Sequence, residues 1–159
     1  KARVSNIKHG NIVISDKDQQ ANIFNNFFSS VFIDDNNFHD HCISRKTEYF
    51  PRVSFSPDIV EKFLSKLKPP LSIGPDGLYA YFLKRLKHCS SSPLASIFEV
   101  SYRRSELPKL WSEAIVIPVF KKGNPFLVEN YRPISLCCVT CKVMESIINS
   151  KVSEYLSTF

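Results

Sequence analysis

Residues 114–136 have the sequence AIVIPVFKKGNPFLVENYRPISL, in which two runs rich in Val, Ile and Phe flank a join of Gly, Asn and Pro residues. Such runs favour strands and such a join favours a turn, so the stretch predicts a β-hairpin. The first arm ends in Lys121 and Lys122, and the second carries Arg132. Lysine supplies a compact charge and arginine a planar fork that holds phosphate oxygens, so the two arms form a candidate polyphosphate clamp. Basic residues near a hairpin tip also serve as a solvated edge that prevents unwanted strand pairing, and these residues alone leave both interpretations open.

The composition indicates a folded protein with one basic part. Of its 159 residues, 43% are apolar and 13% aromatic, which allows a domain with a core and argues against disorder. The net charge is +6, and residues 60–159 hold the whole excess, with 14 positive and 8 negative side chains. Residues 1–59 carry seven of each sign. A basic surface on the second part would attract nucleic acid or another polyanion.

Cysteine usage and hydropathy indicate the compartment. Five cysteines without framework spacing argue against a disulfide scaffold, and no apolar run is long enough to span a membrane. We therefore expect an intracellular, reducing setting and no membrane partner. The chain begins at Lys1 and ends at Phe159, shortly after a strongly patterned helix, so we expect a piece of a longer protein.

Periodicity predicts one amphipathic helix near the start of the chain, over residues 16–32, with Ser15 and Asp18 as a capping box. Its three phenylalanines are at core spacing, which favours packing over a stacking platform for bases. Residues 34–49 are polar and aperiodic, which predicts a loop and an internal boundary. Residues 52–55 predict a short strand.

The second part alternates helix and turn signals. Serine–proline pairs predict helix starts at Ser56 and Ser92, and residues 72–77 predict a turn before a helix over residues 78–86. Further along, the patterns predict two strands and a last helix, over residues 111–120, 131–137 and 143–156. Helices combined with one hairpin predict an α+β fold.

Four sequence blocks in order resemble one protein family. The blocks are NIVISDKDQQANIFNNFFSSVF (11–32), SIGPDGLYAYFLK (72–84), ELPKLWSEAIVIPVFKKGNP (106–125) and ENYRPISLCCVTCKVMESIINSKVSEYL (129–156). Together they resemble the front of a reverse transcriptase of the non-LTR (LINE-type) retrotransposon class, particularly of the Jockey and CR1 kind. The resemblance to the polymerase spans roughly residues 50–159, and the first block resembles the connector that precedes the polymerase. Four blocks in the same order are far more specific than one short motif.

This resemblance implies a right-hand polymerase fragment. Residues 1–49 would be a connector with one helix and a polar loop, and residues 50–159 would be helix-rich fingers with a β-hairpin, ending before the catalytic palm motifs. Lys121 matches the lysine of the family's K-x-G segment and Arg132 the arginine of its N-[YF]-R-P-I-S segment, both of which contact the incoming triphosphate. Lys122 is a weaker match. The residues that the resemblance places near the template are Gly74, Pro75, Asp76, Gly77, Lys84 and Arg85.

The same resemblance implies that catalysis needs groups outside this chain. Reverse transcriptases use palm aspartates that hold Mg²⁺, and we expect these beyond residue 159, so this chain alone should have no catalytic residue and no activity. Residues 32–35 spell F-x-D-D but follow a predicted helix, which favours a helix-end loop over a metal site. The thiols of Cys137, Cys138 and Cys141 are expected to be buried packing groups, and residues 39–42 a polar connector.

The implied partners are an RNA template, a DNA primer or target and a deoxynucleoside triphosphate, in a nuclear or cytoplasmic ribonucleoprotein. Two alternatives remain: a non-enzymatic, basic nucleic-acid-binding module from a decayed or domesticated element, and a structural remnant. The charges at Lys84, Arg85 and Lys87, and those at Arg103 and Arg104, are either solvated helix faces or phosphate contacts. Trp111 is expected to be a packing residue.

Overall fold

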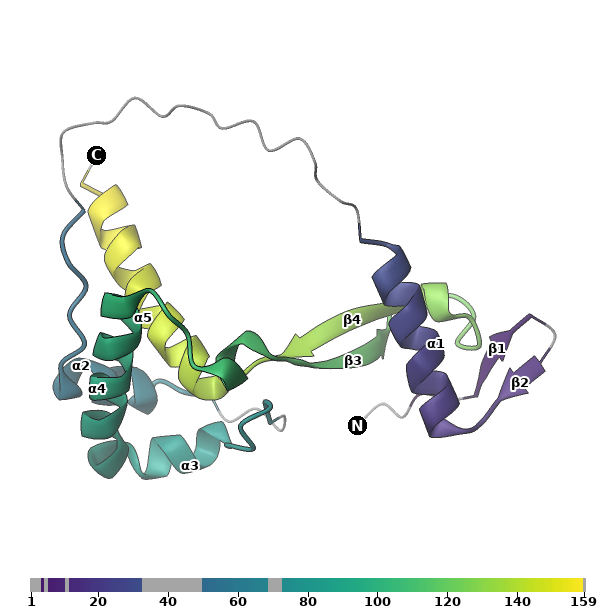
Figure 1. The fold of residues 1–159 in the computed structure, drawn as a ribbon, viewed down its shortest axis with the longest axis horizontal. Coiled ribbons are helices and arrows are strands. Elements are labelled where there is room, and N and C mark those ends of the chain that lie inside the picture. Colours follow the sequence, from purple (N-terminus) through teal and green to yellow (C-terminus); the bar gives the residue numbers. More distant parts are fainter. Residues whose placement is uncertain (1–3, 5, 11, 33–49, 69–72, 159) are drawn as a thin grey trace. The chain divides into compact units, whose positions relative to one another are not determined.

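The computed structural model describes residues 4, 6–10, 12–32, 50–68 and 73–158, and its helices and small antiparallel strand pairs confirm the α+β class (Figure 1). The chain divides into two compact units. The hairpin unit consists of Lys1–Lys46 and Val116–Ser135, and the helical unit of Thr47–Ile115 and Leu136–Phe159. The boundary predicted from sequence, between residues 49 and 50, stays a prediction. Residues 33–49, with the predicted polar loop, most of the F-x-D-D pattern and residues 39–42, lie outside the described residues.

The hairpin unit begins with a short hairpin that the sequence analysis missed. Strands β1 (Ile7–His9) and β2 (Ile12–Ile14) pair antiparallel, with Ile7 opposite Ile14. Gly10 has φ +61°, a left-handed conformation that glycine adopts without strain. The signal was present, because a Gly-Asn pair between two short apolar runs is typical of a hairpin turn.

Helix α1 (Lys17–Ser30) confirms the first predicted helix. Its N-cap is Asp16, whose carboxylate accepts a hydrogen bond from the Gln19 amide at 2.9 Å, so the predicted Ser15 cap was wrong by one residue. Either residue type can cap a helix, and the sequence alone does not fix which of two neighbouring candidates turns inward.

The predicted hairpin is formed by β3 (Ile115–Phe120) and β4 (Tyr131–Leu136), joined through the 3₁₀ turn η2 (Val128–Asn130). The first strand starts later than expected because residues 109–112 form a 3₁₀ turn, η1 (Lys109–Ser112), which contains Trp111. The hairpin unit has its own small apolar core, made by Ile7, Phe24, Phe28, Val128 and Tyr131. Phe24 and Phe28 are therefore packing residues, as expected.

The helical unit is built from α2 (Pro57–Ser65), α3 (Ala80–Arg85), α4 (Lys87–Arg104) and α5 (Val139–Leu156). Helix α2 packs against both α4 and α5 (Figure 1). Ser56 caps α2 and Pro57 occupies its first turn, as predicted. The buried core of this unit comprises Val53, Phe55, Val60, Leu64, Ala80, Leu83, Leu94, Ala95, Phe98, Val139, Val143, Met144 and Ile147.

Two predictions in the helical unit were wrong. Residues 52–55 form no strand, although Val53 and Phe55 alternate into the core as a strand would. Helix α4 begins at Lys87, not at the Ser92–Pro93 pair, so Pro93 lies inside the helix. Lys87 and His88 both approach Glu61 of α2, and these long-range contacts support a first turn that local proline statistics do not anticipate.

Replacing Phe98 by alanine should lower the free energy of unfolding by about 3–5 kcal/mol, because a large buried side chain leaves a cavity. Phe98 is 0% exposed, and its ring centroid lies 5.8 Å from that of Phe55 and 5.7 Å from that of Trp111. Urea titration followed by the fluorescence of Trp111, the one tryptophan of the chain, measures the change.

The matched control is Ile97→Ala on the same helix, where the side chain is 44% exposed. It should change the free energy of unfolding by less than about 0.5 kcal/mol. A Phe98→Ala variant as stable as this control would contradict the described core.

Candidate phosphate-binding residues

The connection between β3 and β4 is an ordered loop. Gly123 has φ +89°, and a Cβ there would lie 3.0 Å from the Asn130 side-chain nitrogen, so only glycine fits without displacement. Asn130 Nδ2 donates to the Asn124 carbonyl at 2.9 Å, and the Lys121 amide donates to the Asn130 carbonyl at 2.8 Å. Asn124 Oδ1 accepts from the Phe126 amide at 3.0 Å. These bonds fix the backbone that carries Lys121.

Tyr131 anchors the second arm of the hairpin. Its side chain is 6% exposed, and its ring meets Phe24 of α1 edge-on at 5.0 Å between centroids. Its hydroxyl donates to the Pro125 carbonyl at 2.7 Å, which ties the strand to the loop. Because successive strand residues point to opposite faces, burial of Tyr131 directs Arg132 away from α1.

Strand alternation, continued one residue beyond β3 to Lys121, predicts that Lys121 and Arg132 share one face of the hairpin. The Lys121 amide donates to the Asn130 carbonyl, so Lys121 lies opposite Asn130. The rings of Phe120 and Tyr131 meet with centroids 5.5 Å apart, so these two residues also lie opposite each other. The other face borders a groove of about 660 Å³ against α1, whose hairpin wall is formed by Val116, Pro118, Pro133 and Ser135. Lys121 and Arg132 are therefore diagonal cross-strand neighbours, which places their Cα atoms about 7–8 Å apart.

Lys121, Lys122 and Arg132 are exposed, and none of them forms an ion pair with another described residue. Lys122 follows Lys121 at the start of the loop and is outside the strand alternation that pairs the other two. Two un-neutralised cations on one rigid face suit a ligand with several negative oxygens.

In the helical unit, residues 74–77 form a tight turn, as predicted. The Gly77 amide donates to the Gly74 carbonyl at 3.1 Å, and Gly77 has φ +70°. A Cβ on Gly74 would lie 2.7 Å from backbone atoms of Cys137 and Cys138, so the turn lies directly against the chain that enters α5. The absence of a side chain at Gly74 is a packing requirement.

Asp76 connects the turn to its surroundings. One carboxylate oxygen accepts from the Leu78 amide at 3.1 Å, and the other accepts from the Thr140 hydroxyl at 3.4 Å, in the first turn of α5. A carboxylate near a helix N-terminus is stabilised by the helix dipole. Both oxygens therefore have structural partners within this unit.

The cations after the turn border a cleft of about 420 Å³ between α2, α3 and α4. Its walls are formed by Ser65, Tyr81, Lys84, Arg85, Lys87 and His88. Lys84 Nζ donates to the Leu67 carbonyl at 2.9 Å, and Arg85 Nε donates to the Tyr81 hydroxyl at 3.1 Å. The sequence analysis singled out the three basic residues but not Tyr81. The four-residue spacing of Tyr81 and Arg85 on a helix was the signal that could have identified this pair.

Of the three cysteines near the start of α5, Cys138 and Cys141 are buried, as expected, whereas Cys137 is only partly buried. Cys138 is fully buried and its thiol donates to the Leu110 carbonyl at 3.1 Å, while burial raises its pKa above 9.0. Burial, followed by the nearby Glu145 carboxylate, raises the pKa of Cys141 to about 11. Among the described residues, no group of three or more His, Cys, Asp or Glu side chains is placed to hold a metal ion.

Two other side chains singled out in the sequence have contacts within the helical unit. Arg103 is exposed and pairs with Glu99 at 3.0 Å, which fits a solvated helix face. Trp111 packs against Phe98, as expected for a packing residue. In the part of the chain that the structure describes, no helix has both the length and the apolar character needed to cross a membrane.

Comparison with known proteins finds a similarity to a transposon protein. No protein-family model matches the chain. The chain is 27% identical over 157 residues to a protein of Drosophila melanogaster named as a probable RNA-directed DNA polymerase from transposon BS. The match covers 93% of this chain and 17% of the relative, so the chain spans about a sixth of the length of that protein. The sequence resemblance to a transposon polymerase therefore extends over nearly the whole chain.

Alkylation at pH 8 should modify Cys89, which is exposed, well before Cys141. A pKa of about 11 in place of 9.0 leaves Cys141 with roughly 100-fold less thiolate, the reactive form, and burial slows it further. Mass spectrometry of iodoacetamide-treated protein measures both rates, and denaturant should make them similar.

The raised pKa of Cys141 also determines how the stability of the folded state changes with pH. Because the folded-state pKa of Cys141 is raised, its thiol favours the folded state below about pH 9, and this contribution is lost as the pH rises towards 11. Equal alkylation of Cys89 and Cys141 in the folded chain would contradict the buried environment.

Proposed function

We propose that this chain is the N-terminal part, connector and fingers, of the RNA-directed DNA polymerase of a non-LTR (LINE-type) retrotransposon. Two findings support the proposal: the likeness to the Drosophila transposon protein over 93% of the chain, and the four ordered sequence blocks. The feature that supports the nucleotide-binding role is that Lys121 and Arg132, on the two arms of the hairpin, are exposed and form no ion pair with a described residue.

In this proposal the hairpin cations bind the triphosphate of the incoming nucleotide. Nucleotidyl transfer places negative charge on phosphate oxygens, and cations fixed in advance stabilise that charge without the reorganisation that solvent requires. Tyr131 and the loop bonds fix the backbone that carries the two cations before the ligand arrives. Lys122 would add general positive charge and no specific contact.

The proposed template contacts lie in the helical unit. The turn at residues 74–77 would approach the template through its backbone, because the structure uses Gly74 for packing and both Asp76 oxygens have partners. Lys84 and Arg85 would then contact template phosphates from α3. The RNA template and the DNA primer are partners of the longer protein in this proposal.

Magnesium ions belong to the longer protein in this proposal. The resemblance places the Mg²⁺ ligands outside this chain, so binding and orientation are the steps that the proposal assigns to it. When bound in the longer enzyme, Mg²⁺ would activate the primer hydroxyl and neutralise the leaving pyrophosphate.

A non-enzymatic nucleic-acid-binding module remains the second candidate, favoured by the basic cleft beside α3. Both candidates predict salt-dependent binding of RNA or DNA. They differ at the hairpin, because the module has no need to bind a free nucleotide through Lys121 and Arg132.

Replacing Arg132 by alanine should weaken the binding of a deoxynucleoside triphosphate by about 10- to 100-fold, because charge-assisted hydrogen bonds to phosphate are lost. Lys121→Ala should cost about 10-fold, whereas the adjacent Lys122→Ala should change affinity by less than about 2-fold. Concentration-dependent photo-crosslinking of an azido-deoxyadenosine triphosphate to the full chain measures these affinities.

Arg104→Ala is the matched control, since it removes one exposed arginine from the helical unit. It should leave nucleotide labelling unchanged. If Arg132→Ala behaves like this control, or if Lys121 and Lys122 contribute equally, the proposed nucleotide site is wrong.

The chain by itself should not extend a primer. With an RNA template, an annealed DNA primer, Mg²⁺ and deoxynucleotides, we expect no incorporation above a no-protein reaction, because the carboxylates for two-metal catalysis are expected outside this chain. Incorporation that Arg132→Ala abolishes would overturn the assignment of this chain as a binding part only.

A further inference from the structure

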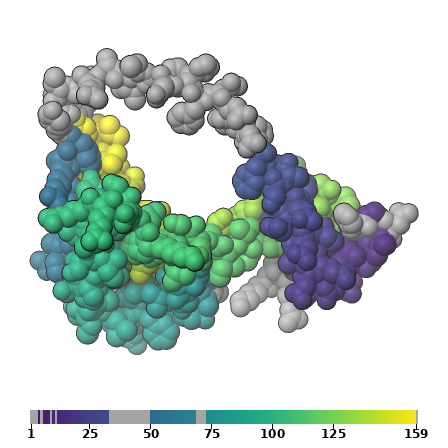
Figure 2. Space-filling view, viewed as in Figure 1, coloured from purple at the N-terminus to yellow at the C-terminus, as the bar shows by residue number. Residues whose placement is uncertain are grey.

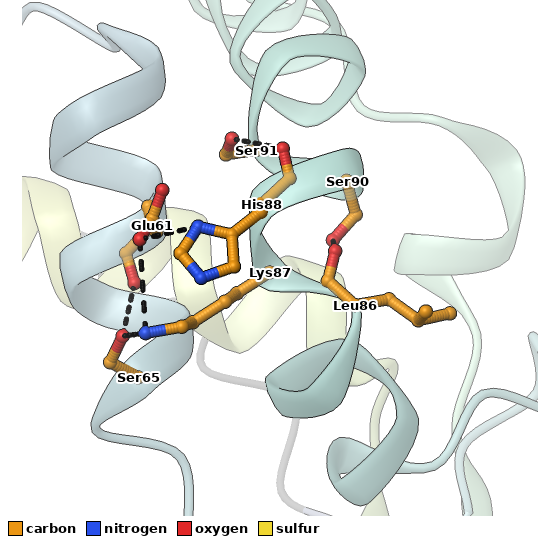
Figure 3. Close-up of polar contacts among 7 residues, drawn as sticks. All are labelled: Glu61, Ser65, Leu86, Lys87, His88, Ser90 and Ser91. Carbon is orange, nitrogen blue, oxygen red and sulfur yellow. Dashed lines mark hydrogen bonds and ion pairs between the residues drawn. The ribbon is translucent and has the colours of Figure 1, made fainter.

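The cleft between α2, α3 and α4 has walls rich in hydrogen-bond donors. Lys84 and Arg85 come from α3, Lys87 and His88 from α4, and Ser65 from α2 (Figure 3 shows the α2–α4 side). The space is about 420 Å³, enough for a phosphate group and part of an attached nucleoside. We refer to it as the basic cleft.

Arg85 and Tyr81 each keep a donor in the basic cleft that no described residue uses. Arg85 is held through Nε to the Tyr81 hydroxyl, and within the described residues its terminal nitrogens form no hydrogen bond. The Tyr81 hydroxyl accepts that bond, so its own hydrogen remains free to donate. The guanidinium also lies over the Tyr81 ring, 5.5 Å from the ring centroid, which fixes both groups in one orientation.

The rim of the cleft is aromatic and exposed. Tyr81 is 50% exposed and the neighbouring Phe82 is 56% exposed, with their ring centroids 6.0 Å apart. Helix α3 lies at the surface of the helical unit, at the lower edge of the view in Figure 2. Aromatic rings beside cations are the combination that binds single-stranded nucleic acid, because bases stack on the rings while phosphates contact the cations.

The Glu61 carboxylate of α2 already contacts two side chains of the basic cleft. Glu61 Oε1 lies 3.0 Å from His88 Nδ1 and 3.7 Å from Lys87 Nζ (Figure 3). Lys87 also donates to the Ser65 hydroxyl at 3.1 Å, and that hydroxyl donates to the Glu61 carbonyl at 2.9 Å. Glu61 therefore neutralises one side of the basic cleft and holds Lys87 and His88 towards α2.

A carboxylate oxygen and a phosphate oxygen accept the same kinds of bonds, so Glu61 competes with an incoming phosphate for Lys87 and His88. Glu61 and Lys87 each keep about 30% of the side chain exposed, so the pair can separate without unfolding of a core. The bond between two such partly exposed ions is weak in water.

We propose that the basic cleft binds one backbone phosphate of single-stranded nucleic acid, that the adjacent base stacks on Tyr81, and that Glu61 weakens this binding as a built-in competitor. The proposal deepens the template role under "Proposed function" but does not depend on the hairpin cations. Arg85, Lys87 and the Tyr81 hydroxyl hold the phosphate, and Lys84 adds charge at the rim. The exposed aromatic rim favours a nucleic acid over an acidic peptide.

The test is fluorescence anisotropy with a 12-nucleotide, 5′-labelled oligouridine and the full chain, measured at several salt concentrations. Glu61→Gln should tighten binding by about 3- to 10-fold, because it removes the competing charge and keeps the side-chain shape. Arg85→Gln should weaken binding by about 10-fold and reduce the salt slope by about 0.7, the value for one phosphate contact on a single strand. Tyr81→Leu should weaken binding by about 5-fold or more.

Glu113→Gln is the matched control for charge, since Glu113 is exposed in the same unit and forms no ion pair with a described residue. It should change affinity by less than about 2-fold. Urea titration through Trp111 fluorescence confirms that each variant is folded. Unchanged or weaker binding in a folded Glu61→Gln variant would overturn the competitor role, and unchanged binding in Arg85→Gln would overturn the site.

The outcomes separate this inference from the proposed function. If Lys121→Ala and Arg132→Ala abolish oligouridine binding while the cleft variants do not change it, the cleft inference fails and the hairpin site stands. If the cleft variants act as expected but Arg132→Ala leaves nucleotide labelling unchanged, the hairpin site fails and the cleft stands. Displacement of oligouridine by polyglutamate at equal charge concentration would overturn nucleic acid as the ligand in favour of an acidic protein.

Discussion

Burial of one tyrosine determines what the central hairpin presents to its surroundings. The Tyr131 ring lies against Phe24 of α1, and its hydroxyl bonds the Pro125 carbonyl, so the second strand cannot rotate or slip by one residue. A one-residue slip would place Arg132 towards the apolar groove and expose Tyr131. The packing of Tyr131 on one face of the hairpin therefore directs Arg132 to the other face.

The two units handle positive charge in different ways. On the hairpin, the cations are exposed and lack ion-pair partners among the described residues, and the loop backbone beneath them is fixed by bonds of Asn124 and Asn130. In the helical unit, the cations lie beside a cleft and several are already bound, to Glu61, Ser65, Leu67 or Tyr81. The first arrangement suits a ligand with concentrated charge, and the second suits selection among extended polyanions.

Sequence patterns predicted the main elements where local signals and tertiary packing agree. The apolar stripes of α1 and α5, the Ser56–Pro57 start of α2 and the two arms of the hairpin were all identified in this way. The start of α4 was not, because contacts with Glu61, 26 and 27 residues before Lys87 and His88, support helix where Pro93 suggested a later beginning.

In the candidate sites, too, the sequence identified individual residues but not the contacts that depend on tertiary packing. The basic residues of both hairpin arms and of the basic cleft were visible in the sequence. The partners were not visible, because Ser65 and Glu61 come from another helix and reach the cations only through packing of α2 on α4. Gly74 was identified as part of a turn, but its role in close packing against residues 137 and 138 needed the fold.

That close packing has a mechanical consequence. With no room for even a methyl group between Gly74 and the backbone entering α5, and with Asp76 bound to Thr140, the turn and the base of an 18-residue helix are joined as one solid piece. A displacement of the first turn of α5 is therefore expected to move residues 74–77 with it.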